Sequence, residues 1–178
     1  TGVRPVSSTS RKVKAVWNIL SQNNFKTHTV GWWPSHPSEP INGISISEFY
    51  GKAKDNLGKP WPMAKGTIHP QSRTAEFARL RIHPEELTEA HLLPFIPLAA
   101  KVNQEEDKSL QVISKLLSEC ASVQSAATYI LENEEWDFMG VYFNAIDHFC
   151  HAFMKYHPPQ LPGVPDNYFE LYKDAVNS

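Results

Sequence analysis

The sequence predicts an α/β fold, with a sheet flanked by helices and interrupted by a proline-rich insertion. Two segments support this prediction, because each places a helical pattern directly before a strand-like run, across a short polar turn. The first lies in residues 11–32 and the second in residues 103–146. The segment between them is repeatedly broken by proline and lacks long periodic stretches.

The composition is typical of a folded globular chain. Its 178 residues suffice for one domain with a hydrophobic core or for a large part of a bigger domain. Hydrophobic residues make up 41% and charged residues 20%, which excludes a disordered segment. The chain has seventeen basic and nineteen acidic residues. It therefore lacks the excess of positive charge that would indicate binding to a nucleic-acid polymer or an anionic membrane.

Three further observations concern the membrane, the cell compartment and the cysteines. No apolar run approaches the roughly 20 residues that span a bilayer. The chain begins at Thr1 without a methionine, so the lack of a visible signal peptide leaves localisation open. Cys120 and Cys150 lie far apart in apolar patterns, and we expect buried free thiols rather than a disulfide or a redox pair.

The first helix and strand follow a polar, irregular stretch. Ser10 can cap a helix that starts near Arg11, and apolar residues then recur at helical spacing, namely Val13, Val16, Trp17 and Leu20. The pair Asn23-Asn24 ends this helix. The next run, FKTHTVGWW, is rich in β-branched and aromatic residues, which predicts a strand over residues 26–32.

A proline-rich loop follows this strand, at the end of the sheet where open α/β folds bind their ligands. Trp32, Trp33 and His36 could stack there on a base or a sugar, but the two tryptophans could equally pack beneath the insertion. Ser35 has no base beside it in the sequence, so we do not expect a nucleophile there. Asn42, with Gly43, is foremost a turn signal and only secondarily a candidate substrate contact.

The segment over residues 51–105 differs from the rest in its many prolines. Short helices are expected near residues 47–56 and 84–91. The stretch TAEFARLRIHP, residues 74–84, alternates well enough to predict an extended strand. We interpret residues 51–105 as an insertion that covers the sheet edge or forms a cap.

The second helix and strand carry the strongest periodic signal. Asn103 and Glu106 stand in the arrangement of a capping box, and an apolar stripe then continues to about Glu132. The run DFMGVYFNAI, residues 137–146, is almost continuously apolar, which suits a strand buried on both faces of a parallel sheet. An amphipathic helix is expected over residues 167–176. The predicted organisation is therefore a first α/β step (1–50), the insertion (51–105) and a second step (106–178).

The motif IDHFCH follows the second strand and carries the clearest chemistry. Asp147 and His151 are four residues apart, so a helical turn would place both side chains on one side. A carboxylate and an imidazole so placed can share one divalent ion, typically zinc. His148 could support this pair by a hydrogen bond or add a ligand. Residue types alone favour a plainer interpretation, in which Asp147 caps the helix and the histidine belongs to the core.

The surroundings of this motif resemble a known family. The stretch WDFMGVYFNAIDHFCHAFMKYHPP is similar to the D-x-x-x-H segment of the type I phosphodiesterase/nucleotide pyrophosphatase family, within the alkaline phosphatase superfamily. Residues 12–47 resemble its helix–strand step with a W-W/P/N-G loop, and residues 102–138 resemble the helix before its metal strand. The resemblance implies a partial alkaline-phosphatase-like sheet, with Asp147 and His151 as ligands of the same zinc ion.

The resemblance also implies parts that this sequence lacks. The family's Thr or Ser nucleophile lies upstream of the first helix, and residues 1–10 contain no counterpart. The resemblance places the family's Asp-His-Gly motif and a further histidine ligand downstream of the region where this chain stops. We therefore expect an internal fragment of a longer enzyme with two zinc ions. The fragment alone would hold at most one ion, weakly, and would be nearly inactive.

The activity implied is hydrolysis of phosphate diesters, pyrophosphates or monoesters by two zinc ions that clamp an in-line displacement. The expected partners are a small phosphate ester or nucleotide and the rest of the same polypeptide. Two alternatives remain: a non-catalytic binding domain that kept the fold, and a hydrolase of sulfate or phosphonate esters.

Overall fold

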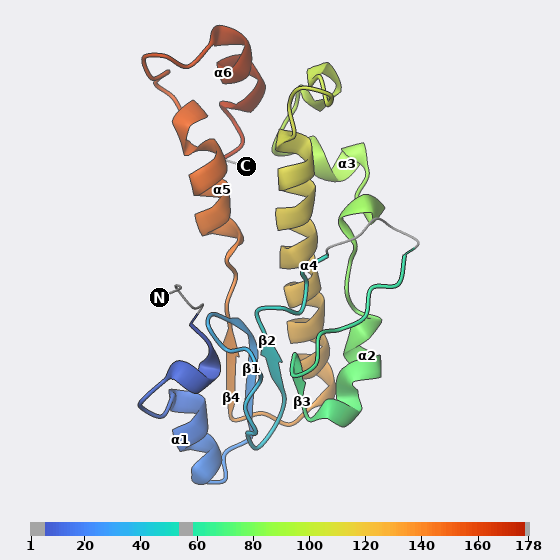
Figure 1. Ribbon diagram of the computed structural model, residues 1–178, viewed down its shortest axis with the longest axis vertical. Coiled ribbons are helices and arrows are strands. Elements are labelled where there is room, and N and C mark those ends of the chain that lie inside the picture. Colours follow the sequence, from blue (N-terminus) through green and yellow to red (C-terminus); the bar gives the residue numbers. More distant parts are fainter. Residues whose placement is uncertain (1–5, 54–58, 177–178) are drawn as a thin grey trace, which may run out of the picture.

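A four-stranded mixed sheet forms the base of the molecule (Figure 1). A computed structural model describes residues 6–53 and 59–176. The strand order is β3-β2-β1-β4; β1 pairs in parallel with β2 and β4, whereas β3 runs antiparallel to β2. The strands are β1 (Thr27–Trp32), β2 (Ser45–Ser47), β3 (Ile68–His69) and β4 (Phe138–Val141). Helices flank this sheet, which confirms the predicted α/β class.

The central strand β1 is almost completely enclosed. Its residues Thr27 to Val30 are at most 2% exposed, because β1 lies between two strands and two layers of helix. The hydroxyl of Thr29 donates to Ser45 Oγ on β2 at 3.1 Å, so this buried polar group is satisfied. The prediction of a strand over residues 26–32 is thus confirmed to within one residue.

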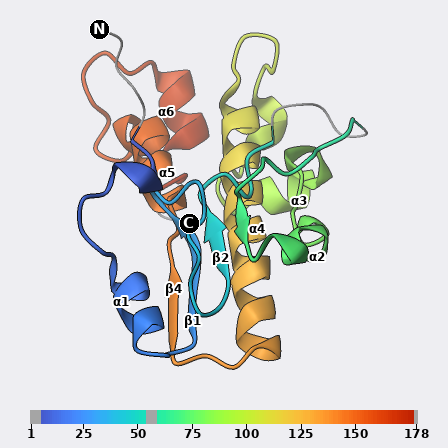
Figure 2. The same ribbon diagram turned by 60° about the horizontal axis from the view of Figure 1, so that its bottom comes forward.

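A bulge at the end of β1 redirects its last side chain. Gly31 has a φ of +76°, and the pairing with β2 shifts between Val30 and Trp32. Val30 therefore packs among the residues that face α4 (Ser109–Asn133), whereas Trp32 contacts Trp17 of α1 (Val16–Gln22) at 5.6 Å between ring centroids. Figure 2 shows α1 and α4 on opposite sides of the strands.

The long helix α4 connects two hydrophobic clusters. Its second half packs Ala126 and Ile130 against Val30 and the rest of the sheet. Its first half packs Ile113 and Leu116 in a second cluster with α3 (Glu89–Leu92), α5 (Ala145–Phe153) and α6 (Asp166–Tyr172). These shorter helices lie beyond the carboxyl ends of the strands (Figure 1).

Residues 51–105 supply more than a cover for the sheet edge. They contribute β3 to the sheet and α2 (Thr74–Ala78) beside α4. Phe77, fully buried, packs edge-to-face against Tyr129 of α4 at 5.7 Å between ring centroids. The hydroxyl of Ser122 on α4 accepts the backbone N–H of Ile82 at 2.9 Å, which fixes the chain between α2 and α3 on the helix.

The prediction of a strand over residues 74–84 is wrong. Phe77 and Leu80 are three residues apart and both pack into the cluster around the sheet, which is helical spacing. Arg73 bonds Glu76 across this first turn and Glu134 at the end of α4 at 2.8 Å. Residues 74–84 therefore form a short helix followed by an irregular stretch.

The prediction of a doubly buried strand over residues 137–146 is also wrong. β4 covers only Phe138–Val141, lies at the sheet edge and buries Gly140 alone, because Trp32 stands over that glycine. Ala145 already begins α5. The apolar run thus combines an edge strand with the buried face of a helix.

Several helices begin at other residues than the sequence predicted. The first helix starts at Val16 because residues 8–10 bind the proline-rich loop, where Ser8 donates to His36 O and Pro37 O. α4 starts at Ser109, since Asn103 accepts backbone bonds in a preceding turn instead. The helix expected over 84–91 splits into a 3-10 turn at Pro84–Glu86 and α3.

The remaining predictions concern two short helices and the two cysteines. Residues 47–53 form the end of β2 and a turn rather than a helix, and residues 54–56 lie outside the described ranges. The helix expected over 167–176 covers Asp166–Tyr172. Cys120 and Cys150 are free thiols, as predicted, but both are partly exposed rather than buried. Within the described residues, none of the helices combines the length and apolarity needed to cross a bilayer.

Gly43→Ala is expected to destabilise the fold strongly. Gly43 precedes β2 with a φ of +152°, and an added Cβ would lie 2.2 Å from the carbonyl oxygen of Thr27 on the central strand. We expect a loss of about 3 kcal/mol in the free energy of unfolding, measured by urea denaturation. Gly163 is the control, because its φ is +87° but nothing lies within 4 Å of an added Cβ. Gly163→Ala should cost only about 1 kcal/mol, and equal losses would contradict this account.

Candidate metal centre

Helix α5 presents Asp147, in its first turn, and His151, in its last turn, to solvent. Ala145, Phe149 and Phe153 form the buried face of this helix, so the residues between them point outward. The Asp147 side chain is 65% exposed and the His151 side chain 80% exposed. A helix of this amphipathic pattern therefore leaves both groups accessible to a ligand.

The two side chains approach each other closely. His151 Nε2 lies 3.5 Å from Asp147 Oδ1. Two ligands of a tetrahedral zinc ion, each about 2.1 Å from the metal, stand about 3.4 Å apart. The separation therefore fits a shared zinc ion. It also fits an ordinary ion pair one helical turn apart, with Asp147 near the positive end of the helix dipole.

Asp147 and His151 alone are too few ligands for a zinc site. Structural and catalytic zinc sites use three or four protein ligands. In the ranges 6–53 and 59–176, no group of three or more His, Cys, Asp or Glu side chains could hold a metal ion. His148 is exposed beside Asp147, and its backbone N–H donates to Asn144 O at 3.1 Å. The geometry thus provides two donors on one helix.

The carboxyl ends of β1 and β2 carry a second group of polar residues. Ser35 is buried, and both its N–H and its hydroxyl donate to Glu48 Oε2, at 3.0 and 3.1 Å. His36 Nδ1 lies 3.1 Å from Ser47 Oγ, and its ring stacks on Phe49 with centroids 4.3 Å apart. These bonds hold the proline-rich loop on the end of β2.

The two tryptophans of this loop have different surroundings. Trp32 is held between Trp17 and Tyr142, at 5.6 and 5.7 Å between ring centroids. Trp33 is 65% exposed, so it does not pack beneath residues 51–105. Its ring offers a free apolar surface at the carboxyl end of the sheet.

Asn42 lies at the other end of β1. Its backbone carbonyl accepts the N–H of Thr27, the first residue of β1, at 2.9 Å. Its side-chain amide donates to the carbonyls of Asn24 and Phe25, each at 3.1 Å. The structure therefore uses Asn42 in a turn and does not bring it to the Asp147–His151 pair.

Sequence reasoning missed a carboxylate near this pair. Glu119 projects from α4 and lines a small cavity at the ends of β1 and β2, together with Ser47, Glu48 and Asn144. Burial raises the pKa of Glu119, while Lys52, His148 and a hydrogen bond from Asn144 act in the opposite direction. The available signal was its spacing, since Glu119 stands three residues after Leu116 on the partly buried side of α4.

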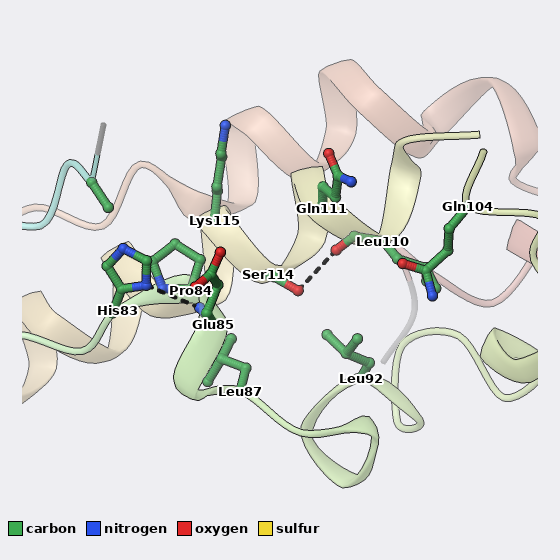
Figure 3. Close-up of a pocket in the computed structure, with 11 residues that line it drawn as sticks. His83, Pro84, Glu85, Leu87, Leu92, Gln104, Leu110, Gln111, Ser114 and Lys115 are labelled. Carbon is green, nitrogen blue, oxygen red and sulfur yellow. Dashed lines mark hydrogen bonds between the residues drawn. The ribbon is translucent and has the colours of Figure 1, made fainter. Parts of the chain in front are cut away.

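A larger cavity, of about 600 Å³, lies between α4 and the turn at Pro84–Glu86 (Figure 3). Leu87, Leu92 and Leu110 supply its apolar wall. The hydroxyl of Ser114 donates to the Leu110 carbonyl at 2.9 Å, so it is used within the wall. We assign this cavity no part in the metal centre, because the Asp147–His151 pair lies on another helix.

Comparison with known proteins gives one match. The model of the family described as type I phosphodiesterase / nucleotide pyrophosphatase matches residues 4–171. No curated protein and no solved structure matches the chain. The match covers nearly the whole chain, both helix–strand steps and the candidate metal ligands.

The pKa of His36 tests the arrangement of the loop that follows β1. Burial lowers the pKa of His36 below its ordinary value of 6.5, while the charge of Glu48 raises it. His36 should therefore be neutral at pH 7, and Glu48→Gln should lower its pKa further. An NMR pH titration of the imidazole C–H signals measures both. Glu89→Gln, an exposed carboxylate on α3, is the control; an unchanged or raised pKa in Glu48→Gln would refute the arrangement.

Proposed function

Because the chain belongs to the type I phosphodiesterase/nucleotide pyrophosphatase family, we propose that it carries half of a zinc site in a hydrolase of phosphate diesters, pyrophosphates or monoesters. The family supports a metal-dependent hydrolase of small phosphate compounds. The assignment of the site to Asp147 and His151 rests on one observation. Both donors face solvent in the first turns after β4, with a carboxylate oxygen 3.5 Å from an imidazole nitrogen.

The position of the pair supports the proposal. β1, β2 and β4 are parallel, so their carboxyl ends meet at one edge of the sheet. Open α/β sheets bind ligands at this edge, because loops and helix N-termini converge there. Asp147 follows β4, while Trp33 and His36 follow β1. A substrate held at this edge could contact both groups.

Each group at this edge of the sheet would have a separate role in the proposed reaction. Asp147 Oδ1 and His151 Nε2 would hold the ion, and His148 would steady Asp147 or add a donor. Zinc, when bound, supplies a Lewis acid that polarises a phosphate oxygen or lowers the pKa of bound water. The exposed ring of Trp33 would support the organic part of the substrate, and neutral His36 would donate or accept one hydrogen bond.

We propose that the nucleophile comes from outside the residues at this edge of the sheet. Ser35 is 5% exposed and its hydroxyl donates to Glu48, so it is neither accessible nor free to attack. The family resemblance assigns this role to a Thr or Ser on a loop that has no counterpart in residues 1–10. We propose that the complete site includes that group and a second metal ion.

Zinc titration of the natural full-length protein tests the ligand assignment. Asp147→Ala should weaken zinc binding more than about 100-fold, since removing even an outer partner of a ligand costs about 10- to 100-fold. Asp166→Ala is a matched control, because Asp166 also stands in the first turn of a helix, α6, and is exposed. Isothermal titration calorimetry gives both affinities. Equal affinity in wild type and Asp147→Ala would remove Asp147 from the site.

A further inference from the structure

The cavity between α4 and the turn at Pro84–Glu86 has the dimensions of a small-molecule site. Its volume of about 600 Å³ falls within the range of about 300–1,000 Å³ that ligand pockets span. Its lining comes from the first half of α4, from this turn and from α3, whereas the candidate metal ligands stand on α5. The cavity is therefore a feature separate from the metal centre.

One side of the cavity is apolar and continuous with the core. Leu92 and Leu110 are 9% and 6% exposed and belong to the hydrophobic cluster of the first half of α4. Leu87, half-buried, completes this wall. The hydroxyl of Ser114 already donates its proton to the Leu110 carbonyl, so it needs no ligand. An apolar body can therefore occupy this side without burying an unsatisfied donor.

The opposite side of the cavity is polar. Gln111 and Lys115 are four residues apart on α4, so their side chains project from the same face of the helix. Figure 3 shows both side chains on one side of Ser114 and those of Leu87 and Leu92 on the other. In the described part of the chain, the Gln111 amide has no hydrogen-bond partner and Lys115 forms no ion pair. Both groups can therefore donate hydrogen bonds to a ligand.

The charges around the cavity favour an anion at this polar side. Glu85 also lines the cavity, but it has other interactions within the chain, and its backbone N–H donates to His83 Nδ1 at 3.2 Å. His83 itself is buried and packs edge-on against Trp61. Glu119, one turn after Lys115, lines a different cavity and makes no ion pair with it. The Lys115 ammonium is thus left for an external anion.

We propose that this cavity binds a small organic carboxylate with an aliphatic tail. The tail lies on Leu87, Leu92 and Leu110, and the carboxylate accepts hydrogen bonds from the Lys115 ammonium and the Gln111 amide. An inorganic anion would leave the apolar wall in water, and a neutral alcohol would leave the ammonium unpaired. The two sides together therefore select an amphipathic anion. This site does not depend on the proposed function.

Octanoate tests the proposal, with octan-1-ol as its uncharged counterpart. Octanoate should shift the backbone amide NMR signals of residues 110–115 in the natural full-length protein, to saturation. Its affinity should exceed that of octan-1-ol about tenfold, as expected from one charge-assisted hydrogen bond. Lys115→Gln should abolish this preference, whereas Lys115→Arg should keep most of it. Lys101→Gln, which changes an exposed lysine outside the cavity, is the control and should leave the preference unchanged.

Two variants that fill the cavity locate the ligand. Ser114→Phe adds a ring between the two sides, and Leu87→Trp adds one on the apolar wall. Each should weaken the binding of octanoate and of octan-1-ol at least about tenfold, because the tail loses its contact with the leucines. Thermal unfolding shows which variants are folded, and either filling variant decides the question if the other is unstable.

Three results would overturn the proposal: no saturable shift with octanoate, wild-type binding in a folded filling variant, or an unchanged preference for octanoate in Lys115→Gln. The last result would place the carboxylate elsewhere. Asp147→Ala should bind octanoate as wild type does, since Asp147 does not line the cavity. Failure of the proposed metal site and failure of this carboxylate site therefore give separate results.

Discussion

The packing of α4 is the constraint on which the rest of the structure depends. Ala126 and Ile130 fix its second half to the sheet, and Ile113 and Leu116 fix its first half to the helices beyond the strands. Its 25 residues form one rod about 38 Å long. Because one rigid element belongs to both hydrophobic clusters, the position of α5 relative to the strands is set largely by α4.

This arrangement explains how a short helix can present the proposed ligand pair. The apolar face of α5 turns toward α4 through Phe149 and Phe153, so Asp147 and His151 face solvent at the end of β4. The strand itself contributes little burial, since β4 lies at the sheet edge. The precision that a metal site needs must then come from the packing of α5 against α4.

Local sequence signals predicted part of this structure. The β-branched run in β1 and the apolar stripe of α4 located these elements, and the end of helix α4, at Asn133, lies within one residue of the predicted end. Helix starts were misplaced because Ser10 and Asn103 bond within short turns that precede the helices. A strand was wrongly predicted over residues 74–84 because apolar residues three positions apart, such as Phe77 and Leu80, can resemble an alternating pattern in a short segment. Contacts such as Ser35 with Glu48 depend on how separate loops meet, which spacing along one element does not encode.

The central claim is that Asp147 and His151 share one metal ion. Anomalous diffraction at the zinc edge, from crystals of the natural protein grown with zinc, tests it most directly. The account predicts a peak about 2.0–2.2 Å from both an Asp147 carboxylate oxygen and His151 Nε2. It is contradicted if zinc binds elsewhere while these two side chains contact only each other.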